Sequence, residues 1–356
     1  MAVKFGMVAF NAGGHGRTPA AVFRENLEQA ALAEELGFDS VWLVEHHFSD
    51  YALVGDPTVF AAALAERTRR VRIGTAVIVL PLHHPVRVAE NVAVVDNLSA
   101  GRLDVGVGRG YQPAEFAGFG VPMEDSQDRF DEALRAIELL WGEPEVTFHG
   151  QHVRLDGVRL VPRPVQQPPP IWIAAVSPPT YTRLGGEGRR ILTAPNFTPL
   201  DLVRQNLDAY RSALATGGHD LATFDSPVML QTYVGRSHEE GRERPREPAM
   251  GYYELLGRLL PREESAPPGY DFYRRVEANV RDLRYEQIYG TACFGSADEV
   301  RERIRRLRDE AGVTYLMTWF NFGGLPAGEV VASMERFATH VMPEFREGGQ
   351  ERAAGG

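Results

Sequence analysis

Two histidines and a glutamate directly follow an apolar run. Glu45, His46 and His47 come at the end of Val41–Val44, a run that is typical of a buried strand. Imidazole and carboxylate groups are costly to place there unless they are paired or used. Because imidazole titrates near neutral pH, a single histidine pointing into a cavity could act as a general base. The alternative is a hydrogen-bonded structural histidine.

The same residues raise the question of a metal site. Consecutive residues on an extended chain point to opposite sides, so Glu45, His46 and His47 are poorly placed to ligate one ion together. We therefore expect no metal ion at this position.

A second group of residues could bind an anion. Arg109 lies in the glycine-rich segment Gly106–Gly110, where its guanidinium offers a bidentate fork to a phosphate. Ser177 and Thr180 are three residues apart at an expected helix start, so both hydroxyls can face an anion there. The alternatives are a surface ion pair for the arginine and a plain helix cap for the hydroxyls. If their strands are neighbours, the three side chains would form one monophosphate pocket.

A third segment, Gly74–Pro81, leads from an expected strand into His83, His84 and Pro85. Its small residues could admit a planar ring at the strand end. His84 precedes a proline and is therefore held extended, a structural role as plausible as a chemical one.

Strand-like and helix-like segments alternate along the chain, which is the pattern of a parallel sheet with helices outside it. The expected helices cover residues 20–36, 57–67, 86–98, 129–141, 200–214 and 329–341. The eight expected strands are Val3–Ala9, Ser40–Val44, Val71–Leu80, Leu103–Val107, Ile171–Ala175, Ile191–Ala194, Val228–Val234 and Thr314–Phe320.

Eight strands in this order predict an α/β fold, a single (β/α) barrel of TIM type, in which active sites lie at the carboxyl ends of the strands. A doubly wound sheet is the alternative. We expect one domain over residues 1–345, with insertions at about 142–170 and 237–290. Within the first insertion, Val146–Leu160 alternates like a hairpin around Gly150. Residues 346–356 are expected to be a disordered tail.

Composition excludes several classes of protein. The 356 residues carry a net charge of −10, which argues against a nucleic-acid partner. The single cysteine, Cys293, excludes an internal disulfide and fits a reducing compartment. The chain opens without a signal-like segment, and no apolar stretch approaches the ~20 residues that cross a bilayer. We expect a cytoplasmic protein without a membrane partner.

The chain resembles the bacterial luciferase family of flavin-dependent monooxygenases, and most closely its catalytic α-subunit type. The family fold is a single barrel with insertions, which agrees with the strand count. The resemblance covers nearly the whole chain and is carried by Gly37–Asp39, Trp42–Phe48, Gly74–Pro81, His84–Arg87, Ala89-Glu90, Ser99–Arg102, Arg109-Gly110, Gly269–Phe272, Ala332–Met334 and Val341–Pro343.

The resemblance implies a site for reduced FMN at the barrel mouth. His46 matches the catalytic histidine that assists proton transfer around the flavin, and His47 is its matching neighbour, with Glu45 beside them. Ala76 and Val77 match a pair that carries a non-prolyl cis peptide under the flavin ring. The phosphate would lie on the anion-binding group named above, Arg109, Ser177 and Thr180.

Three departures from the family pattern concern this site. Gly108 stands where the luciferases keep a reactive cysteine, so we expect a roomier pocket without thiol chemistry. Val176 replaces a glutamate beside the phosphate. Gln127 falls where a second phosphate arginine would be, and Arg129 could substitute for it. These departures argue against the light-emitting aldehyde reaction but leave flavin binding as the expectation.

The resulting hypothesis is a two-component monooxygenase. A separate reductase would supply reduced FMN, dioxygen would form a flavin hydroperoxide, and one oxygen atom would enter a small organic substrate, as in a tailoring step of natural-product biosynthesis. A lid within Ser237–Tyr289 would exclude water. A homodimer is expected by resemblance, with Pro57–Arg67 suited to close helix packing. A deazaflavin-dependent oxidoreductase and a non-catalytic flavin-binding protein are the alternatives.

Overall fold

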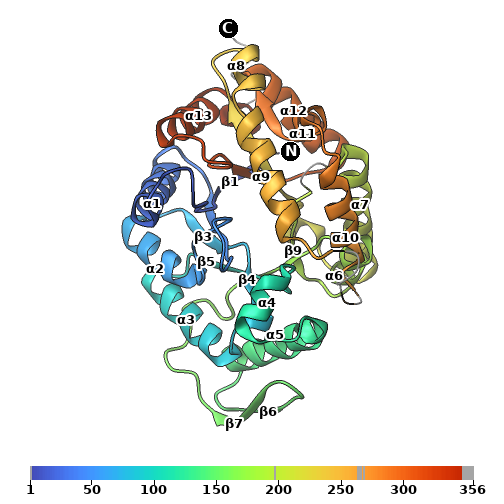
Figure 1. Cartoon of the computed structure of the whole chain (residues 1–356). Helices are drawn as coiled ribbons and strands as arrows, with labels where there is room; N and C mark the ends of the chain where they lie inside the picture. The colour runs from blue at the N-terminus through green and yellow to red at the C-terminus, as the bar shows by residue number, and fades with distance from the viewer. Residues whose placement is uncertain (1, 196–197, 263–266, 268, 347–356) are drawn as a thin grey trace.

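The computed structural model describes residues 2–195, 198–262, 267 and 269–346. Its centre is an array of parallel strands in the order β10, β12, β1, β2, β3, β5, β8, β9 (Figure 1). Their bounds are β1 Lys4–Ala9, β2 Ser40–Leu43, β3 Arg72–Thr75, β5 Leu103–Gly108, β8 Ile171–Ala174, β9 Arg190–Leu192, β10 Pro227–Val234 and β12 Tyr315–Trp319.

Hydrogen bonds join the two ends of this array. The backbone N–H of Met229 in β10 donates to the carbonyl of Thr193, which directly follows β9, at 2.8 Å. The Thr193 hydroxyl donates to the carbonyl of Pro227 at 2.6 Å. The array is therefore a barrel, and each of its eight strands overlaps one predicted from the sequence. The predicted strand Val71–Leu80 was too long: it ends at Thr75 as β3, and Ile78–Val79 forms a separate short strand, β4, that pairs with β5.

Helices surround the strands, as Figure 1 shows. Two of them illustrate how sequence sets their starts: the side chains of Thr18 and Asp56 cap the first turns of α1 and α2, each followed by a proline. The bounds are α1 Pro19–Glu35, α2 Pro57–Arg67, α3 Pro85–Leu98, α4 Pro113–Phe119, α5 Ser126–Gly142, α6 Pro178–Gly186, α7 Leu200–Thr216, α8 His238–Glu243, α9 Arg246–Leu259, α10 Asp271–Arg281, α11 Tyr285–Thr291, α12 Ala297–Ala311 and α13 Ala327–His340.

Three aromatic side chains pack together in the core. The buried rings of Trp42, Trp172 and Tyr315 pack against one another at centroid distances of 5.5 to 6.3 Å. A Cβ atom on Gly74 would lie 2.2 Å from the Trp42 ring. Gly74 therefore admits a planar ring, as expected, but that ring belongs to the protein core and not to a ligand.

Both expected insertions extend the barrel: the first contains a β-hairpin, and the second contains helices. Strands β6 (Val146–His149) and β7 (Arg154–Val158) form the antiparallel hairpin predicted around Gly150, at the bottom of Figure 1. The second insertion holds α8 to α11. It is followed by β11 (Cys293–Gly295), a parallel edge strand on β10 that the sequence analysis did not identify.

The remaining expectations concern the chain as a whole. Arg346, the first residue of the expected tail, donates to the carboxylate of Asp39 at 2.8 Å, and residues 347–356 lie outside the described part of the chain. The assignment of residues 1–345 to one domain stays a prediction. None of the helices in the described ranges is long and apolar enough to span a membrane.

Candidate active site

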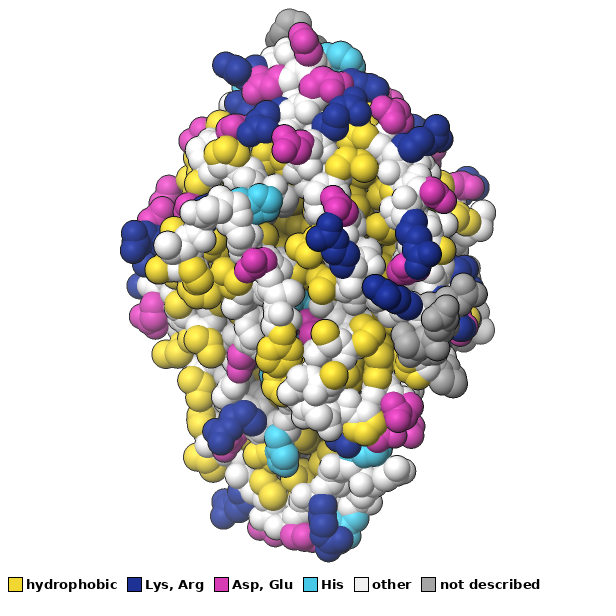
Figure 2. Space-filling view, viewed as in Figure 1, with side chains coloured by type: hydrophobic (Ala, Val, Ile, Leu, Met, Phe, Trp, Pro, Cys, Tyr) yellow, Lys and Arg dark blue, Asp and Glu magenta, His cyan; other side chains and the backbone are white. Residues whose placement is uncertain are grey.

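A cavity of about 300 Å³ opens at the carboxyl ends of the barrel strands. Loops after β1, β2, β3, β5, β8 and β9 line it, and helices α9 and α10 contribute side chains from the second insertion. In the surface view, hydrophobic side chains gather around the middle of the face, with many charged ones toward its edges (Figure 2). The cavity is thus where the (β/α) barrel fold predicts an active site.

His46 is held in this cavity by a buried carboxylate. Its Nδ1 lies 3.0 Å from Oε1 of Glu115, whose side chain is 1% exposed. The same Oε1 accepts the backbone N–H of His47 at 2.9 Å. Because a carboxylate accepts hydrogen bonds, Nδ1 of His46 carries the proton and Nε2 keeps its lone pair. Gln112 Nε2 lies 3.0 Å from the same Nδ1, but because an amide nitrogen only donates, it forms no hydrogen bond with a protonated Nδ1.

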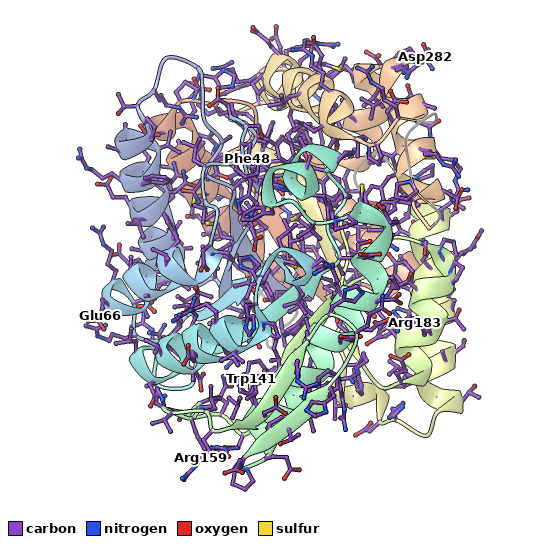
Figure 3. The ribbon with its side chains drawn as sticks, turned by 60° about the horizontal axis from the view of Figure 1, so that its bottom comes forward. Phe48, Glu66, Trp141, Arg159, Arg183 and Asp282 are labelled. Atoms are coloured by element: carbon purple, nitrogen blue, oxygen red, sulfur yellow. The ribbon has the colours of Figure 1, made fainter. Side chains whose placement is uncertain are left out.

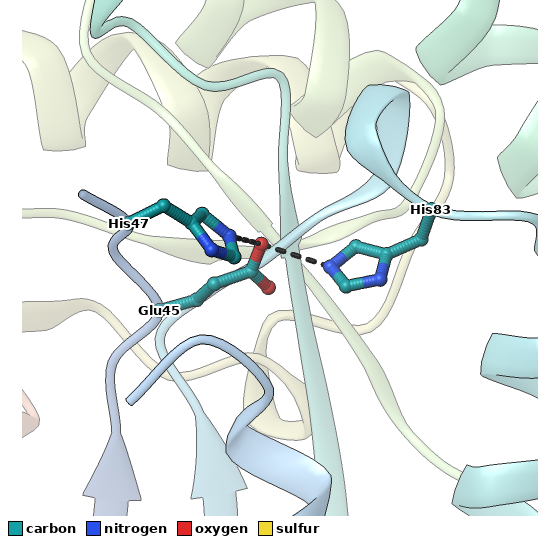
Figure 4. A group of neighbouring side chains, drawn as sticks. All are labelled: Glu45, His47 and His83. Atoms are coloured by element: carbon teal, nitrogen blue, oxygen red, sulfur yellow. Dashed lines mark hydrogen bonds and ion pairs between the residues drawn. The ribbon is translucent and has the colours of Figure 1, made fainter. Parts of the chain in front are cut away.

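Glu45 forms a separate buried cluster with two histidines, as Figure 4 shows. Its Oε1 lies 3.0 Å from Nε2 of His47 and 2.8 Å from Nε2 of His83, and its Oε2 accepts the backbone N–H of Val79 at 3.1 Å. Burial acts to raise the pKa of Glu45, but the hydrogen bonds from both histidines and the backbone outweigh it and lower that pKa. Burial acts to lower the pKa of His83, but the Glu45 carboxylate raises it.

This cluster contains three possible metal-ligand atoms, one of which the sequence did not suggest. The chain alternation expected from the sequence does hold, because His46 turns to Glu115 while Glu45 and His47 turn to each other. However, His83 adds a third ligand atom, and the three atoms lie within 4.8 Å of one another. The donor set could therefore accept a divalent cation, although its hydrogen bonds already satisfy the carboxylate without one.

The three residues of the expected anion-binding group line the same cavity. Strands β5 and β8 are neighbours, so Arg109, Ser177 and Thr180 all line the same corner. The hydroxyls of Ser177 and Thr180 lie 2.8 Å apart, and the Ser177 side chain makes no cap to the backbone of α6. Because Pro178 and Pro179 carry no N–H, side-chain donors must do most of the anion binding at this helix start.

Small side chains form the wall between this corner and His46. Ala76, Val77, Gly108 and Ala174 line the cavity there. A Cβ atom on Gly108 would lie 2.6 Å from the Val77 side chain, so the missing side chain is what keeps this wall open. The peptide bond between Ala76 and Val77 is cis, as the family resemblance implied.

Arg109 also connects the barrel to the second insertion. Its guanidinium donates to the carbonyl of Gly269 at 2.7 Å and lies 4.1 Å above the ring of Tyr270. The Tyr270 hydroxyl lies 2.9 Å from that of Ser126 on α5. Part of the expected lid, residues 237–290, therefore lines the cavity, through α9, Gly269 and α10, and residues 263–266 and 268 lie outside the described part.

Two predicted site residues lie elsewhere. His47 does not line the cavity; its ring packs edge-on against Phe119, whose neighbour Phe48 lies beside α4 (Figure 3). Arg129 is also outside the lining, with Nε 3.9 Å from the Asp125 carboxylate. Arg183 of α6 lines the anion-binding corner instead. The position of Arg129 therefore gives no support to its predicted phosphate contact.

Several residues of the site were not singled out in the sequence. Glu115 lies 69 positions after His46, and no local pattern joins them. Tyr51 and Tyr252 contact each other across 201 positions. His83 is the exception: the sequence pattern His83-His84-Pro85 after an expected strand marks this position as a place for polar site residues.

Comparisons with known proteins agree with this geometry. A family model described as luciferase-like monooxygenase matches residues 3–315. Relatives include the uncharacterized protein y4vJ of Sinorhizobium fredii, 35% identical over 94% of this chain and 95% of that protein. The alkanal monooxygenase alpha chain of the Kryptophanaron alfredi symbiont is 29% identical over 90% and 92%. The oxygenase component of the flavin-dependent trigonelline monooxygenase of Acinetobacter baylyi is 27% identical over 94% and 93%.

Solved structures with the same fold include monooxygenases as well. The monooxygenase RslO1 from Streptomyces bottropensis is 31% identical, with a TM-score of 0.83 over 96% of this chain and 100% of that one. Two further structures are 20% identical and show the fold alone. They are the oxygenating constituent of the Pseudomonas putida 3,6-diketocamphane monooxygenase in complex with FMN, with a TM-score of 0.81 over 97% and 99%, and an F420-dependent secondary alcohol dehydrogenase, with a TM-score of 0.76 over 97% and 100%.

Proposed function

The chain belongs to the luciferase-like monooxygenase family, and from that premise we propose that it is the oxygenase component of a two-component monooxygenase. It would use reduced FMN and dioxygen to put one oxygen atom into a small organic substrate. The observation that carries this proposal is one cavity with an anion-binding corner at one side, a wall of small residues, and His46 held by Glu115.

The residues of the corner fit a flavin phosphate. Arg109 supplies a guanidinium, and Ser177 and Thr180 supply two hydroxyls that have only one contact between them, so a hydroxyl hydrogen remains for a phosphate oxygen. The start of α6 adds the positive end of a helix dipole. Ala76, Val77 and Gly108 would lie against the flat ring.

Bound reduced flavin would supply the chemistry with dioxygen, and the protein residues would control protons and water. His46 would accept or return a proton at Nε2, since Glu115 holds its Nδ1 proton. Helices α9 and α10 would cover the site and exclude solvent, with Tyr252, Leu256 and Tyr273 pointing into the cavity. This arrangement favours an enzyme over a non-catalytic flavin-binding protein.

A separate reductase is the proposed partner. Support comes from the relatives described as an oxygenase component and an oxygenating constituent, names that imply a second protein in their systems. A cytoplasmic location, expected from the single cysteine, stays a prediction.

We also propose a homodimer through α2 and α3. Val59 on α2 is 70% exposed, and Val94 and Leu98 on α3 are 44% and 47% exposed. The two helices pack against each other, so in the proposed dimer these exposed side chains would be covered by the partner.

A deazaflavin-dependent oxidoreductase is the second candidate. It is favoured by the likeness of fold to the F420-dependent dehydrogenase, and the cavity wall of small residues would suit either ring system. Anaerobic turnover with reduced deazaflavin, together with none with reduced FMN in air, would establish this candidate and exclude the first.

The proposal is tested by reoxidation kinetics. The protein is loaded with FMN, reduced without oxygen, and mixed with oxygenated buffer. We expect oxidised flavin and hydrogen peroxide to form more slowly than from free reduced FMN, because the closed cavity protects the oxygenated cofactor. Reoxidation at the rate of free flavin, or no binding of reduced FMN, would contradict the proposal.

A further inference from the structure

A chain of tyrosine hydroxyls lies beside His46. The hydroxyls of Tyr51 and Tyr252 are 2.5 Å apart, and that of Tyr111 lies 3.4 Å from Tyr51. The Tyr51 ring stands edge-on to the His46 ring at 4.6 Å. All three tyrosines line the cavity, and none of them is needed for the flavin phosphate or for holding His46.

Two aromatic stacks join the barrel loops to the second insertion. Tyr51, after β2, stacks on Tyr252 of α9 with the planes at 23°, and Tyr111, after β5, stacks on Tyr273 of α10 at 11°. Phe10, after β1, lies nearly perpendicular to both members of the first stack. The first stack and Phe10 therefore form a wall of ring faces and edges, which pack best against another flat ring.

The order of the strands separates this wall from the anion-binding corner by two to four strands around the barrel. Arg109 and Ser177 follow β5 and β8, whereas Phe10 and Tyr51 follow β1 and β2. If the flavin phosphate occupies the corner and its ring lies on Ala76 and Val77, the space along the aromatic wall is left for the substrate. This step rests on the proposed function.

The charges near the wall are already paired. Glu45 accepts from His47 and His83, and Glu115 accepts from His46. A charged substrate would find no free counter-ion on this side of the described cavity. A purely aliphatic substrate would also fit poorly, because it would leave the tyrosine hydroxyls facing a group that cannot hydrogen-bond.

The hydroxyl chain has one hydrogen to spare. Two contacts between three hydroxyls use two hydrogens, so one O–H remains to be donated. Within the described residues, the Tyr252 hydroxyl contacts only that of Tyr51. Burial raises the pKa of Tyr51 and Tyr252 well above the usual value, so both stay neutral and can donate or accept.

We infer that this half of the cavity binds a flat aromatic substrate carrying a phenol or aryl carbonyl oxygen, and that the Tyr51–Tyr252 hydroxyl pair binds that oxygen. Tyr51 of this pair packs against His46, so the bound oxygen would lie near the group that moves protons. Tyr252 belongs to α9, so binding of this substrate would also hold the insertion against the barrel.

The test compares three probes on the protein saturated with oxidised FMN: 2-naphthol, naphthalene and 1-decanol. Dissociation constants are measured by calorimetry. We expect 2-naphthol to bind about tenfold more tightly than naphthalene, as one hydrogen bond provides, and more tightly than 1-decanol. In Tyr252→Phe the preference for 2-naphthol over naphthalene should disappear while the FMN affinity is unchanged.

Tyr253→Phe is the matched control, because Tyr253 is the next residue of α9, is buried, and does not line the cavity. Its probe affinities should match those of the wild type. Tyr51→Phe is the second variant if Tyr252→Phe does not fold. Tighter binding of 1-decanol, an unchanged naphthol preference in the folded variant, or no binding of 2-naphthol to the FMN-saturated protein would overturn the inference.

The probe-binding experiment can fail independently of the flavin experiment that tests the proposed function. A protein that fails to bind FMN refutes the flavin proposal, and the ranking of the probes can still be measured on it. A protein that binds FMN and delays its reoxidation, yet prefers 1-decanol, keeps the flavin proposal and refutes the aromatic substrate.

Discussion

Glu115 and His46 lie 69 residues apart in the sequence and 3.0 Å apart in the cavity. The carboxylate comes from α4, after β5, and the imidazole from the loop after β2, so the barrel itself brings them together. Holding one nitrogen of a histidine by a buried acceptor fixes which nitrogen is free to take a proton. Glu115 is thus a positioning residue for His46, which is the proposed proton-transfer group.

We expect His46→Ala to slow turnover by about 100-fold or more, the usual contribution of a general acid–base group. Glu115→Gln should slow it by about 10- to 100-fold, because a hydrogen bond to a charged group is lost. Turnover is measured as oxygenated product at saturating reduced FMN. The double variant should be no slower than His46→Ala, since Glu115 acts through His46. Additive losses would show that Glu115 has a role of its own.

Arg109→Ala should weaken FMN binding by about 2–3 kcal/mol, since a charge-assisted hydrogen bond to phosphate is removed. Riboflavin lacks the phosphate, so its affinity should stay the same in this variant. Fluorescence titration measures both ligands. Arg129→Ala serves as the comparison, because Arg129 lies outside the cavity. If Arg129→Ala weakens FMN binding and Arg109→Ala does not, the phosphate lies elsewhere.

The Glu45 cluster predicts a defined pH dependence of stability. The pKa of Glu45 is lowered from 4.5, so its contribution is present above that value and is lost as the pH falls through the folded-state pKa. The pKa of His83 is raised from 6.5, so its contribution is present below 6.5 and is lost as the pH rises through the folded-state pKa. The interaction is therefore complete between pH 4.5 and 6.5.

Glu45→Gln should lower the free energy of unfolding by about 1–3 kcal/mol within this window, because two buried donors lose their charged acceptor. The difference from the wild type should shrink at lower and at higher pH. Urea unfolding at a series of pH values measures it. Glu66→Gln on the exposed side of α2 is the matched control, marked by Glu66 in Figure 3. A difference that is constant with pH would contradict the paired arrangement.

If the dimer forms through α2 and α3, a charged residue placed in this apolar interface should dissociate it into monomers. Val59→Glu on α2 should shift sedimentation at micromolar concentration from dimer to monomer, since burying an unpaired carboxylate is costly. Val161→Glu introduces the same charge at an equally exposed position outside α2 and α3 and should leave the dimer intact. A wild-type protein that sediments as a monomer would refute the proposal directly.

The sequence by itself determined the barrel and the residues at its strand ends. Alternating strand and helix patterns report which residues are buried locally, and right-handed parallel connections then order the strands. The positions of His46, Arg109 and Ser177 followed, because the carboxyl ends of neighbouring strands meet at one mouth. Strand β11, Cys293–Gly295, was missed because it is a short edge strand that pairs only with β10 and lies outside the eight-strand pattern of the barrel.

Only the tertiary structure decided which side chains act together. The partners of His46, Glu45 and Tyr51 are Glu115, His83 and Tyr252, which lie 69, 38 and 201 positions away. Periodicity shows that a side chain is buried, but not which distant segment it meets. The same reason explains Gly74, whose open space is filled by the Trp42 ring inside the barrel.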